Sequence, residues 1–219
     1  MGKIILVTGG VRSGKSAFAE RYAMHCAASE GARVAYIDGD FVINPTFSQI
    51  EKADIVASCN INFSRPLMKA AKDAGKTIAT DVHVLSNIYG DYNREFLEYA
   101  DIIFLSDENL PSPREEFLTA LKSAYGMKII VMGCGADGAL LYERAKDEIA
   151  HFPAAKPERI VNTVGAGDAL FSCFIHFYAG GMDAENALHY AQHFAAIKIG
   201  TDGAAKGFVD ETALKNIKL

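Results

Sequence analysis

A glycine-rich stretch, NTVGAGDALF at residues 162–171, holds the residue types that phosphate chemistry needs. Helical spacing of apolar residues begins near residue 166, so Gly165, Ala166 and Gly167 are predicted to present main-chain N–H groups at a helix N-terminus. Such a site favours an anion, and Asp168 follows it directly. A carboxylate at this place is suited to take the proton of an incoming hydroxyl. The alternative is an acid that only complements the helix dipole.

A second glycine-rich stretch, GGVRSGKS at residues 9–16, fits the pattern G-x-x-x-x-G-K-[ST] between a predicted strand and a predicted helix. In this pattern, glycines let backbone N–H groups surround a phosphate, the lysine adds a positive charge, and the hydroxyl binds Mg²⁺. The residues concerned are Gly9, Gly14, Lys15 and Ser16. The next predicted strand ends at Asp38, where an acid could meet the metal, although acids at strand ends are equally often solvated.

Short apolar runs alternate with helical periodicities, which predicts an α/β fold with a mostly parallel sheet and helices on both faces. Strands are expected at 3–8, 33–38, 54–58, 76–80, 101–105 and 127–133, helices at 14–29, 64–74, 93–99, 113–125, 167–179 and 184–199 with a short one after 210, and an antiparallel hairpin near 138–152. Ligands of such sheets bind beyond the carboxyl ends of the strands, where both glycine-rich stretches are predicted to lie.

We expect a single domain over residues 1–219, with a P-loop unit at 1–45 and the remainder at 46–219. The stretch 39–50 shows no clear period and is the predicted seam. The net charge of −5 gives no footprint for nucleic acid or an anionic membrane. Four scattered cysteines and the lack of a long apolar segment predict buried thiols in a cytoplasmic protein. The spacing of the histidines points to no particular site.

The stretch from Asn162 to Asp168 resembles the D-T-x-G-A-G-D signature of the ribokinase/PfkB carbohydrate kinase family, with Asn in place of the commoner first Asp. The resemblance extends from about Ala53 to the C-terminus and implies a three-layer ribokinase-like fold. It also implies that Asp168 is the catalytic base and that the residues from Gly165 to Gly167 form the anion hole. The implied activity is transfer of the γ-phosphate of ATP to an alcohol of a small sugar-like metabolite.

The same resemblance implies further ligand contacts. Those with the nucleotide are expected at Gly135, Asp137, Gly138, Thr163, Gln192 and Gly203. The segment from Ser106 to Asn109 replaces the family's magnesium motif, with Asp107 as its candidate ligand beside Asp38. The expected cofactors are ATP and Mg²⁺, and the resemblance leaves room for a monovalent cation and for a homodimer.

The first 40 residues, including ILVTGGVRSGKSAFAE, are similar to the opening of adenosylcobinamide kinase, and the sugar-binding half and lid of the PfkB family are not recognised before Ala53. Three hypotheses therefore stay open. The chain is a PfkB-type kinase that uses Asp168, a P-loop NTPase or kinase that uses Lys15, or a truncated nucleotide-binding protein without turnover. A single site cannot readily use both loops, because each places the anion at its own helix N-terminus.

Overall fold

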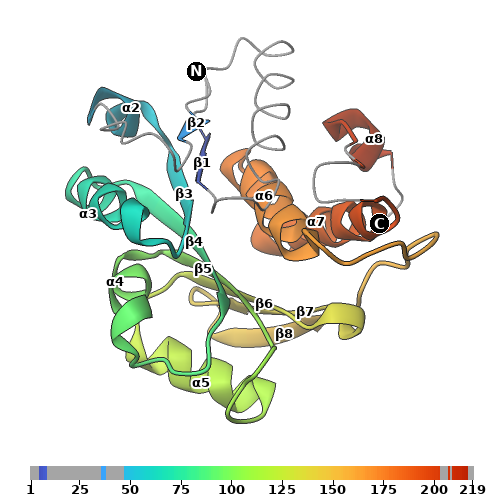
Figure 1. Cartoon of the computed structure of the whole chain (residues 1–219), viewed down its shortest axis with the longest axis horizontal. Helices are drawn as coiled ribbons and strands as arrows, with labels where there is room; N and C mark the ends of the chain where they lie inside the picture. The colour runs from blue at the N-terminus through green and yellow to red at the C-terminus, as the bar shows by residue number, and fades with distance from the viewer. Residues whose placement is uncertain (1–4, 9–35, 38–46, 203–206, 208, 217–219) are drawn as a thin grey trace.

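The structure is a computed structural model in which one twisted sheet runs through the molecule (Figure 1). It describes residues 5–8, 36–37, 47–202, 207 and 209–216. The strands are β1 (Ile5–Thr8), β2 (Tyr36–Ile37), β3 (Ile55–Cys59), β4 (Thr77–Val84), β5 (Ile102–Ser106), β6 (Ile129–Gly133), β7 (Ala139–Glu143) and β8 (Glu148–Phe152). Their order in the sheet is β2-β1-β3-β4-β5-β6-β7-β8.

The sheet is mostly parallel, as the sequence predicts. All pairs from β2 to β6 are parallel, and β6, β7 and β8 form the antiparallel end of the sheet. The hairpin expected near 138–152 is confirmed, and it reverses around a turn that includes Asp147, whose φ is +49°. The parallel strands therefore deliver their carboxyl ends to one edge of the sheet.

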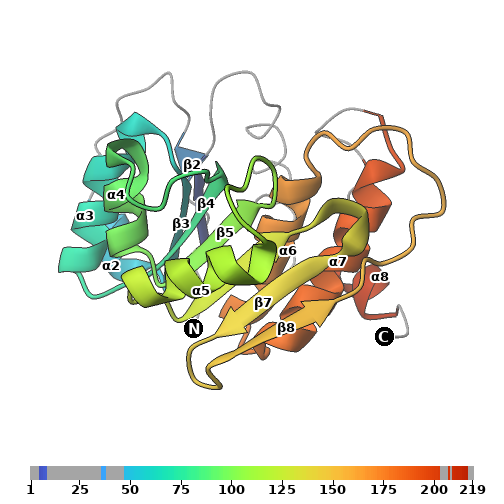
Figure 2. The same ribbon diagram turned by 90° about the horizontal axis from the view of Figure 1, so that it is seen from below.

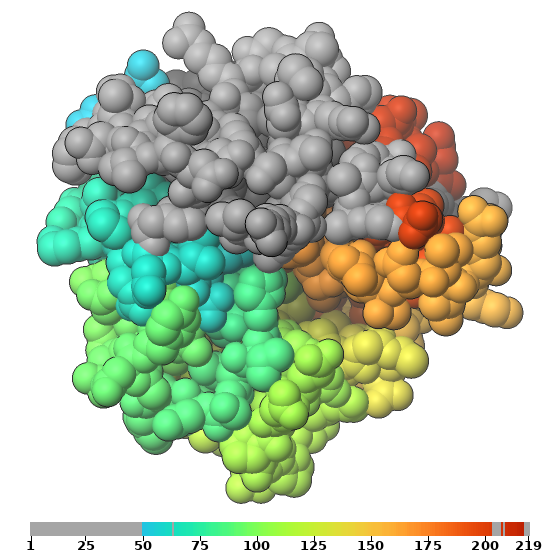
Figure 3. Space-filling view, viewed as in Figure 1, coloured from blue at the N-terminus to red at the C-terminus, as the bar shows by residue number. Residues whose placement is uncertain are grey.

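Helices cover both faces of the sheet, which confirms the predicted α/β layers (Figures 1 and 2). The described helices are α2 (Phe47–Lys52), α3 (Arg65–Asp73), α4 (Asp91–Tyr99), α5 (Arg114–Ala124), α6 (Ala166–Ala179), α7 (Ala184–Ile199) and α8 (Glu211–Lys215). Two short 3₁₀ turns, η1 (Asn62–Ser64) and η2 (Gly135–Asp137), complete the set. Figure 3 shows the layer coloured cyan to green and the layer coloured orange to red on different sides of the molecule.

Each face of the sheet has its own apolar core. One core packs helices α2 to α5 against residues such as Ile103, and the other packs α6, α7 and α8 against residues such as Phe104. Because successive side chains of a strand point to opposite faces, neighbouring residues of β5 serve different cores. The Phe104 ring meets Phe171 and Phe174 of α6 edge-on, with ring centroids 5.1 and 5.2 Å apart. These contacts fix α6 on the sheet.

Asp side chains cap α7 and α8, whereas the residue before α3 does not cap that helix. Asp183 and Asp210 each accept a hydrogen bond from a backbone N–H of the helix that follows. Ser64 precedes α3, but its hydroxyl donates to the carbonyls of Cys59 and Ile61 at 2.9 and 2.8 Å. The reason is η1, which already holds Ser64 in a helical conformation and turns its side chain away from the helix amides.

The predicted seam at 39–50 overlaps a helix that the sequence did not indicate. Residues 47–52 form α2, and Ile50 is only 2% exposed. Six residues make fewer than two helical turns, which is too short for a periodic pattern to show. None of the helices in the described part of the chain is long and apolar enough to cross a lipid bilayer.

Candidate active site

The loop before α6 is anchored at the end of α7. The backbone N–H of Val161 donates to the carbonyl of Ile199 at 2.8 Å, and the side-chain amide of Asn162 donates to the carbonyl of Thr201 at 3.4 Å. The Asn162 carboxamide oxygen also accepts the N–H of Val164 at 3.1 Å. Asn162, which occupies the first position of the signature, thus shapes the turn that starts α6.

Gly165 starts α6 in the left-handed conformation, with φ of +81°, which favours glycine. The anion hole predicted from three amides is smaller in the structure, because the Ala166 N–H donates to the carbonyl of Thr163 at 3.1 Å. A turn closed between residues three apart uses this amide. Among the described residues, the N–H groups of Gly165 and Gly167 donate to no protein acceptor. These two amides and the positive end of the helix dipole can hold an anion.

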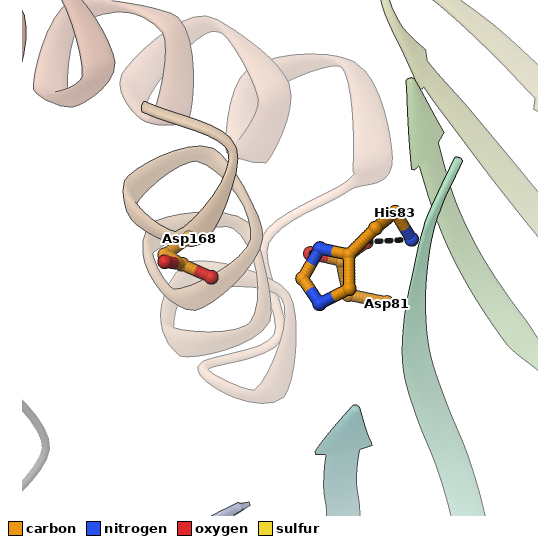
Figure 4. Close-up of side chains that lie close together, drawn as sticks. All are labelled: Asp81, His83 and Asp168. Carbon is orange, nitrogen blue, oxygen red and sulfur yellow. Dashed lines mark hydrogen bonds and ion pairs between the residues drawn. The ribbon is translucent and has the colours of Figure 1, made fainter. Parts of the chain in front are cut away.

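Asp168 is the third residue of α6, and its side chain lies next to the end of β4 (Figure 4). A carboxylate oxygen of Asp168, a carboxylate oxygen of Asp81 and a ring nitrogen of His83 all lie within 4.8 Å of one another. The structure therefore brings the predicted base together with two residues that the sequence analysis did not select.

Asp81 and His83 form a compact turn where β4 leaves the sheet. One oxygen of Asp81 accepts the backbone N–H of His83 at 2.9 Å, and the other lies 3.2 Å from His83 Nδ1. The register of β4 against β5 shifts between Asp81 and Val84, and His83 has a φ of +56°. The side chain of Asp81 is 6% exposed. The sequence does carry a signal for this pair, because an acid and a histidine stand two residues apart directly after the strand predicted at 76–80.

A second polar cluster lies beyond the ends of β5 and β6. Asp107, the predicted metal ligand, accepts two hydrogen bonds from Arg114, at 2.9 Å from Nε and 2.5 Å from Nη2. The same guanidinium reaches Asp137, a predicted nucleotide contact, at 2.9 Å from Nη1. The hydrogen bonds that Arg114 donates to Asp137 and then to Asp107 raise its pKa. Burial raises the pKa of the neighbouring Cys134 thiol to about 11, so it is protonated at neutral pH.

Two more predicted nucleotide residues contact the end of β8. Gly138 has a φ of +97°, and a Cβ on it would lie 2.0 Å from the carbonyl oxygen of Phe152. The buried Gln192 donates from Nε2 to the same oxygen at 3.0 Å. Gly135 is exposed with a φ of +58°. These contacts give both Gly138 and Gln192 a structural role in addition to the predicted one.

Of the remaining predicted positions, only Thr163 is among the described residues, and it is exposed beside the α6 turn. Gly9, Gly14, Lys15, Ser16, Asp38 and Gly203 lie outside the described residues.

Comparison with known proteins adds to this geometry. A family model for the pfkB family carbohydrate kinases matches residues 24–211. The chain belongs to this family. The match starts well before Ala53, where the sequence resemblance was expected to begin, and it leaves out the glycine-rich stretch at residues 9–16.

Relatives of known activity are similar to parts of this pfkB family chain. Fructosamine kinase of Bacillus subtilis is 31% identical over 119 residues, which are 54% of this chain and 41% of that protein. The 5-dehydro-2-deoxygluconokinase of Clostridium perfringens is 26% identical over 198 residues, covering 82% of this chain and 56% of that protein. The chain thus spans about half the length of these curated relatives.

Solved structures show the same fold. A microbiome-derived acarbose kinase superposes with a TM-score of 0.78 at 16% identity, covering 98% of both chains. Arabidopsis thaliana ribokinase, complexed with ribose and ATP, has a TM-score of 0.74 at 14% identity, also over 98% of both chains. A putative ribokinase II of E. coli in complex with ATP and Mg²⁺ has a TM-score of 0.72 at 14% identity and the same coverage. The ribokinase-like fold predicted from the sequence is confirmed.

Proposed function

We propose that the chain transfers the γ-phosphate of ATP to an alcohol group of a small sugar-like metabolite, with Asp168 as the base. The observation that carries this proposal is the start of α6. There, the amides of Gly165 and Gly167 have no described protein acceptor and lie one to three residues from the carboxylate-bearing Asp168. The amides are suited to hold the negative charge of a transferring phosphoryl group.

Asp168 is better suited to accept the substrate proton than its neighbour Asp81. Asp81 is buried, whereas Asp168 is partly exposed next to the anion site. The Asp81–His83 pair is therefore assigned a supporting position and Asp168 the chemical step.

The substrate class is inferred from relatives of the family. Their names specify fructosamine, 5-dehydro-2-deoxygluconate, ribose 1-phosphate and deoxyribose kinases, all of which act on sugars or sugar derivatives. Because the chain spans about half the length of the first relatives, the complete activity is part of the proposal.

ATP and Mg²⁺ are the proposed cofactors. The two open amides at the positive end of α6 fit a phosphate group. Mg²⁺ bound to ATP would reduce the repulsion between the phosphates and an incoming alcohol. Asp107 stays a predicted ligand, although in the structure Arg114 occupies its carboxylate. A monovalent cation, a homodimer, a cytoplasmic location and the single-domain organisation also stay predictions.

The test is Asp168→Asn, with transfer of labelled phosphate from ATP measured directly across the sugars named above. We expect kcat to fall by about 10²- to 10⁴-fold, because the amide cannot accept the proton, while the KM for ATP changes little. Asp183→Asn is the matched control, since it alters an acid at the start of α7, where Asn caps a helix equally well. An unchanged rate in Asp168→Asn would exclude Asp168 as the base.

The intact pattern at residues 9–16 supports a second candidate, a P-loop NTPase or small-molecule kinase that resembles adenosylcobinamide kinase. Under this alternative Lys15→Ala abolishes ATP turnover and Asp168→Asn does not. Loss of turnover in Asp168→Asn with Lys15→Ala still active supports the pfkB-type mechanism. A chain that binds ATP and transfers no phosphate with any variant fits the third hypothesis, a nucleotide-binding protein without turnover.

A further inference from the structure

Three different metal-binding groups meet between the end of β4 and the start of α6. They are the carboxylates of Asp81 and Asp168 and the imidazole of His83, whose candidate ligand atoms all lie within 4.8 Å of one another (Figure 4). Two of them come from one turn of the chain and the third from a helix 85 positions further on. The grouping is thus produced by the tertiary fold.

The chemistry of this cluster favours a cation. Two carboxylates this close repel each other, and the side chain of Asp81 is 94% buried, so water screens it poorly. His83 is held against Asp81 both by its backbone N–H and by its ring. This double contact holds the imidazole next to the two acids before any ion arrives.

We propose that Asp81, His83 and Asp168 bind one divalent transition-metal cation, with Zn²⁺ as the reference ion. An imidazole with two carboxylates is a common ligand set for Zn²⁺. Mg²⁺ prefers oxygen ligands and retains its waters, so we expect it to bind to these three side chains more weakly than Zn²⁺. The site differs from the Mg²⁺ ligands expected from the sequence, Asp107 and Asp38.

The geometry needs only a small adjustment. Zinc binds imidazole nitrogen and carboxylate oxygen at about 2.0–2.2 Å, so two ligand atoms on one tetrahedral ion lie about 3.5 Å apart. The three atoms must therefore approach one another by at most about 1.3 Å, which side-chain rotation can provide. A water or a ligand oxygen would complete the tetrahedron.

Occupation of this site has a regulatory consequence that rests on the proposed function of Asp168. A carboxylate that coordinates zinc cannot also take a proton from the substrate alcohol. Zn²⁺ would therefore inhibit phosphoryl transfer by binding the base itself. The binding of Zn²⁺ does not depend on that function and is measured separately.

Binding is tested on the full chain, freed of metal with a chelator and titrated with Zn²⁺ alone by calorimetry. Co²⁺, followed by its visible absorption, reports the ligand set. We expect one equivalent of Zn²⁺ to bind, and its affinity to fall at least about tenfold in His83→Asn and in Asp81→Asn. Asn tolerates the φ of +56° at position 83, so this variant removes the imidazole without straining the turn.

His151→Asn is the matched control, because His151 is an exposed histidine on β8. Its Zn²⁺ affinity should equal that of the wild type. Melting in the presence of chelator establishes that each variant is folded, and His83→Asn decides the test if Asp81→Asn does not fold. Equal Zn²⁺ affinity in His83→Asn and wild type would overturn the site. Full displacement of Zn²⁺ by millimolar Mg²⁺ would overturn its assignment to a transition metal.

The inhibitory consequence is tested by phosphate transfer at increasing Zn²⁺, each variant being compared with its own rate without zinc. We expect the inhibition constant to rise at least about tenfold in His83→Asn. Zn²⁺ binding that depends on His83 without any inhibition would remove Asp168 from the ligand set. If the wild type transfers no phosphate to any sugar, the proposed function fails, whereas the calorimetric result on the metal site still stands.

Discussion

At the level of single residues, Gly138 is required by the backbone that faces it. A Cβ at this position would lie 2.0 Å from the Phe152 carbonyl oxygen and 2.6 Å from the Ala154 nitrogen. Backbone atoms cannot move aside as the end of a flexible side chain can. The glycine was expected for nucleotide binding, but its conformation and its neighbours already demand it.

We predict that Gly138→Ala lowers the free energy of unfolding by about 3 kcal/mol or more, because a clash adds to the strain of a positive φ. Gly135→Ala, at φ of +58° with no atom within 4 Å, should cost about 1–2 kcal/mol from strain alone. Gly126→Ala has open space and no positive φ, so urea unfolding should show little change. Equal losses at positions 138 and 126 would contradict the clash.

The sequence predicted the candidate site only where it depends on local structure. The start of α6 and the position of Asp168 follow from glycines before a helical pattern, and both are found. The neighbours Asp81 and His83 were missed, because they reach Asp168 only through the shift in register at the end of β4 and the packing of α6 on the sheet. The hydrogen bond from Ala166 to Thr163 was missed as well, since it depends on how tightly the loop turns.

At the level of elements, a polar side-chain contact joins α8 to α6. His176 Nε2 of α6 lies 3.0 Å from Glu211 Oε2 of α8, and Lys215 also pairs with Glu211. The hydrogen bond from Lys215 and then that from His176 lower the pKa of Glu211. His176 and Glu211 border a small pocket that the buried Cys173 also lines.

This contact predicts a pH-dependent stability. A carboxyl whose pKa is lowered by folding stabilises the protein above its unfolded pKa of about 4.3, and the effect is lost as the pH falls through the folded value. Glu211→Gln should therefore cost about 0.5–1 kcal/mol at pH 7, a modest amount because the contact is partly exposed, and less near pH 3. Urea unfolding of this variant and of Glu158→Gln, an exposed acid, at both pH values tests it. A loss that is the same at both pH values would argue for packing and not charge.

Elements with long, regular patterns were predicted well, and short ones were not. The strands and the helices α6 and α7 lie where the spacing of apolar residues predicts them. This spacing is informative because it places the apolar side chains on the face that is buried. The six-residue α2 and the turn η1 carry too few residues for a period.

At the level of the whole molecule, two cores share one sheet. Leu121 is fully buried in the core on one face, and Phe174 in the core on the other. If the sheet couples the two faces, as the predicted single domain requires, damage to either core should lower one common transition.

We predict that Leu121→Ala and Phe174→Ala each lower the free energy of unfolding by about 2–5 kcal/mol within one transition. Far-UV circular dichroism and tyrosine fluorescence are the probes, since the chain has no tryptophan. Lys69→Ala on the exposed face of α3 is the control and should change little. Separate transitions for the two cores would show that the faces unfold independently, against a single domain.

The unpaired edge of β8, the last strand of the sheet, affects whether two copies of the protein associate. In the described part of the chain, β8 hydrogen-bonds to β7 on one side only, and its other side is an open row of peptide groups. Glu148 and His151 are exposed along β8. Polar and charged side chains on an edge strand disfavour its pairing with the sheet of another molecule. We therefore expect the exposed side chains of β8 to oppose edge-to-edge aggregation at high protein concentration.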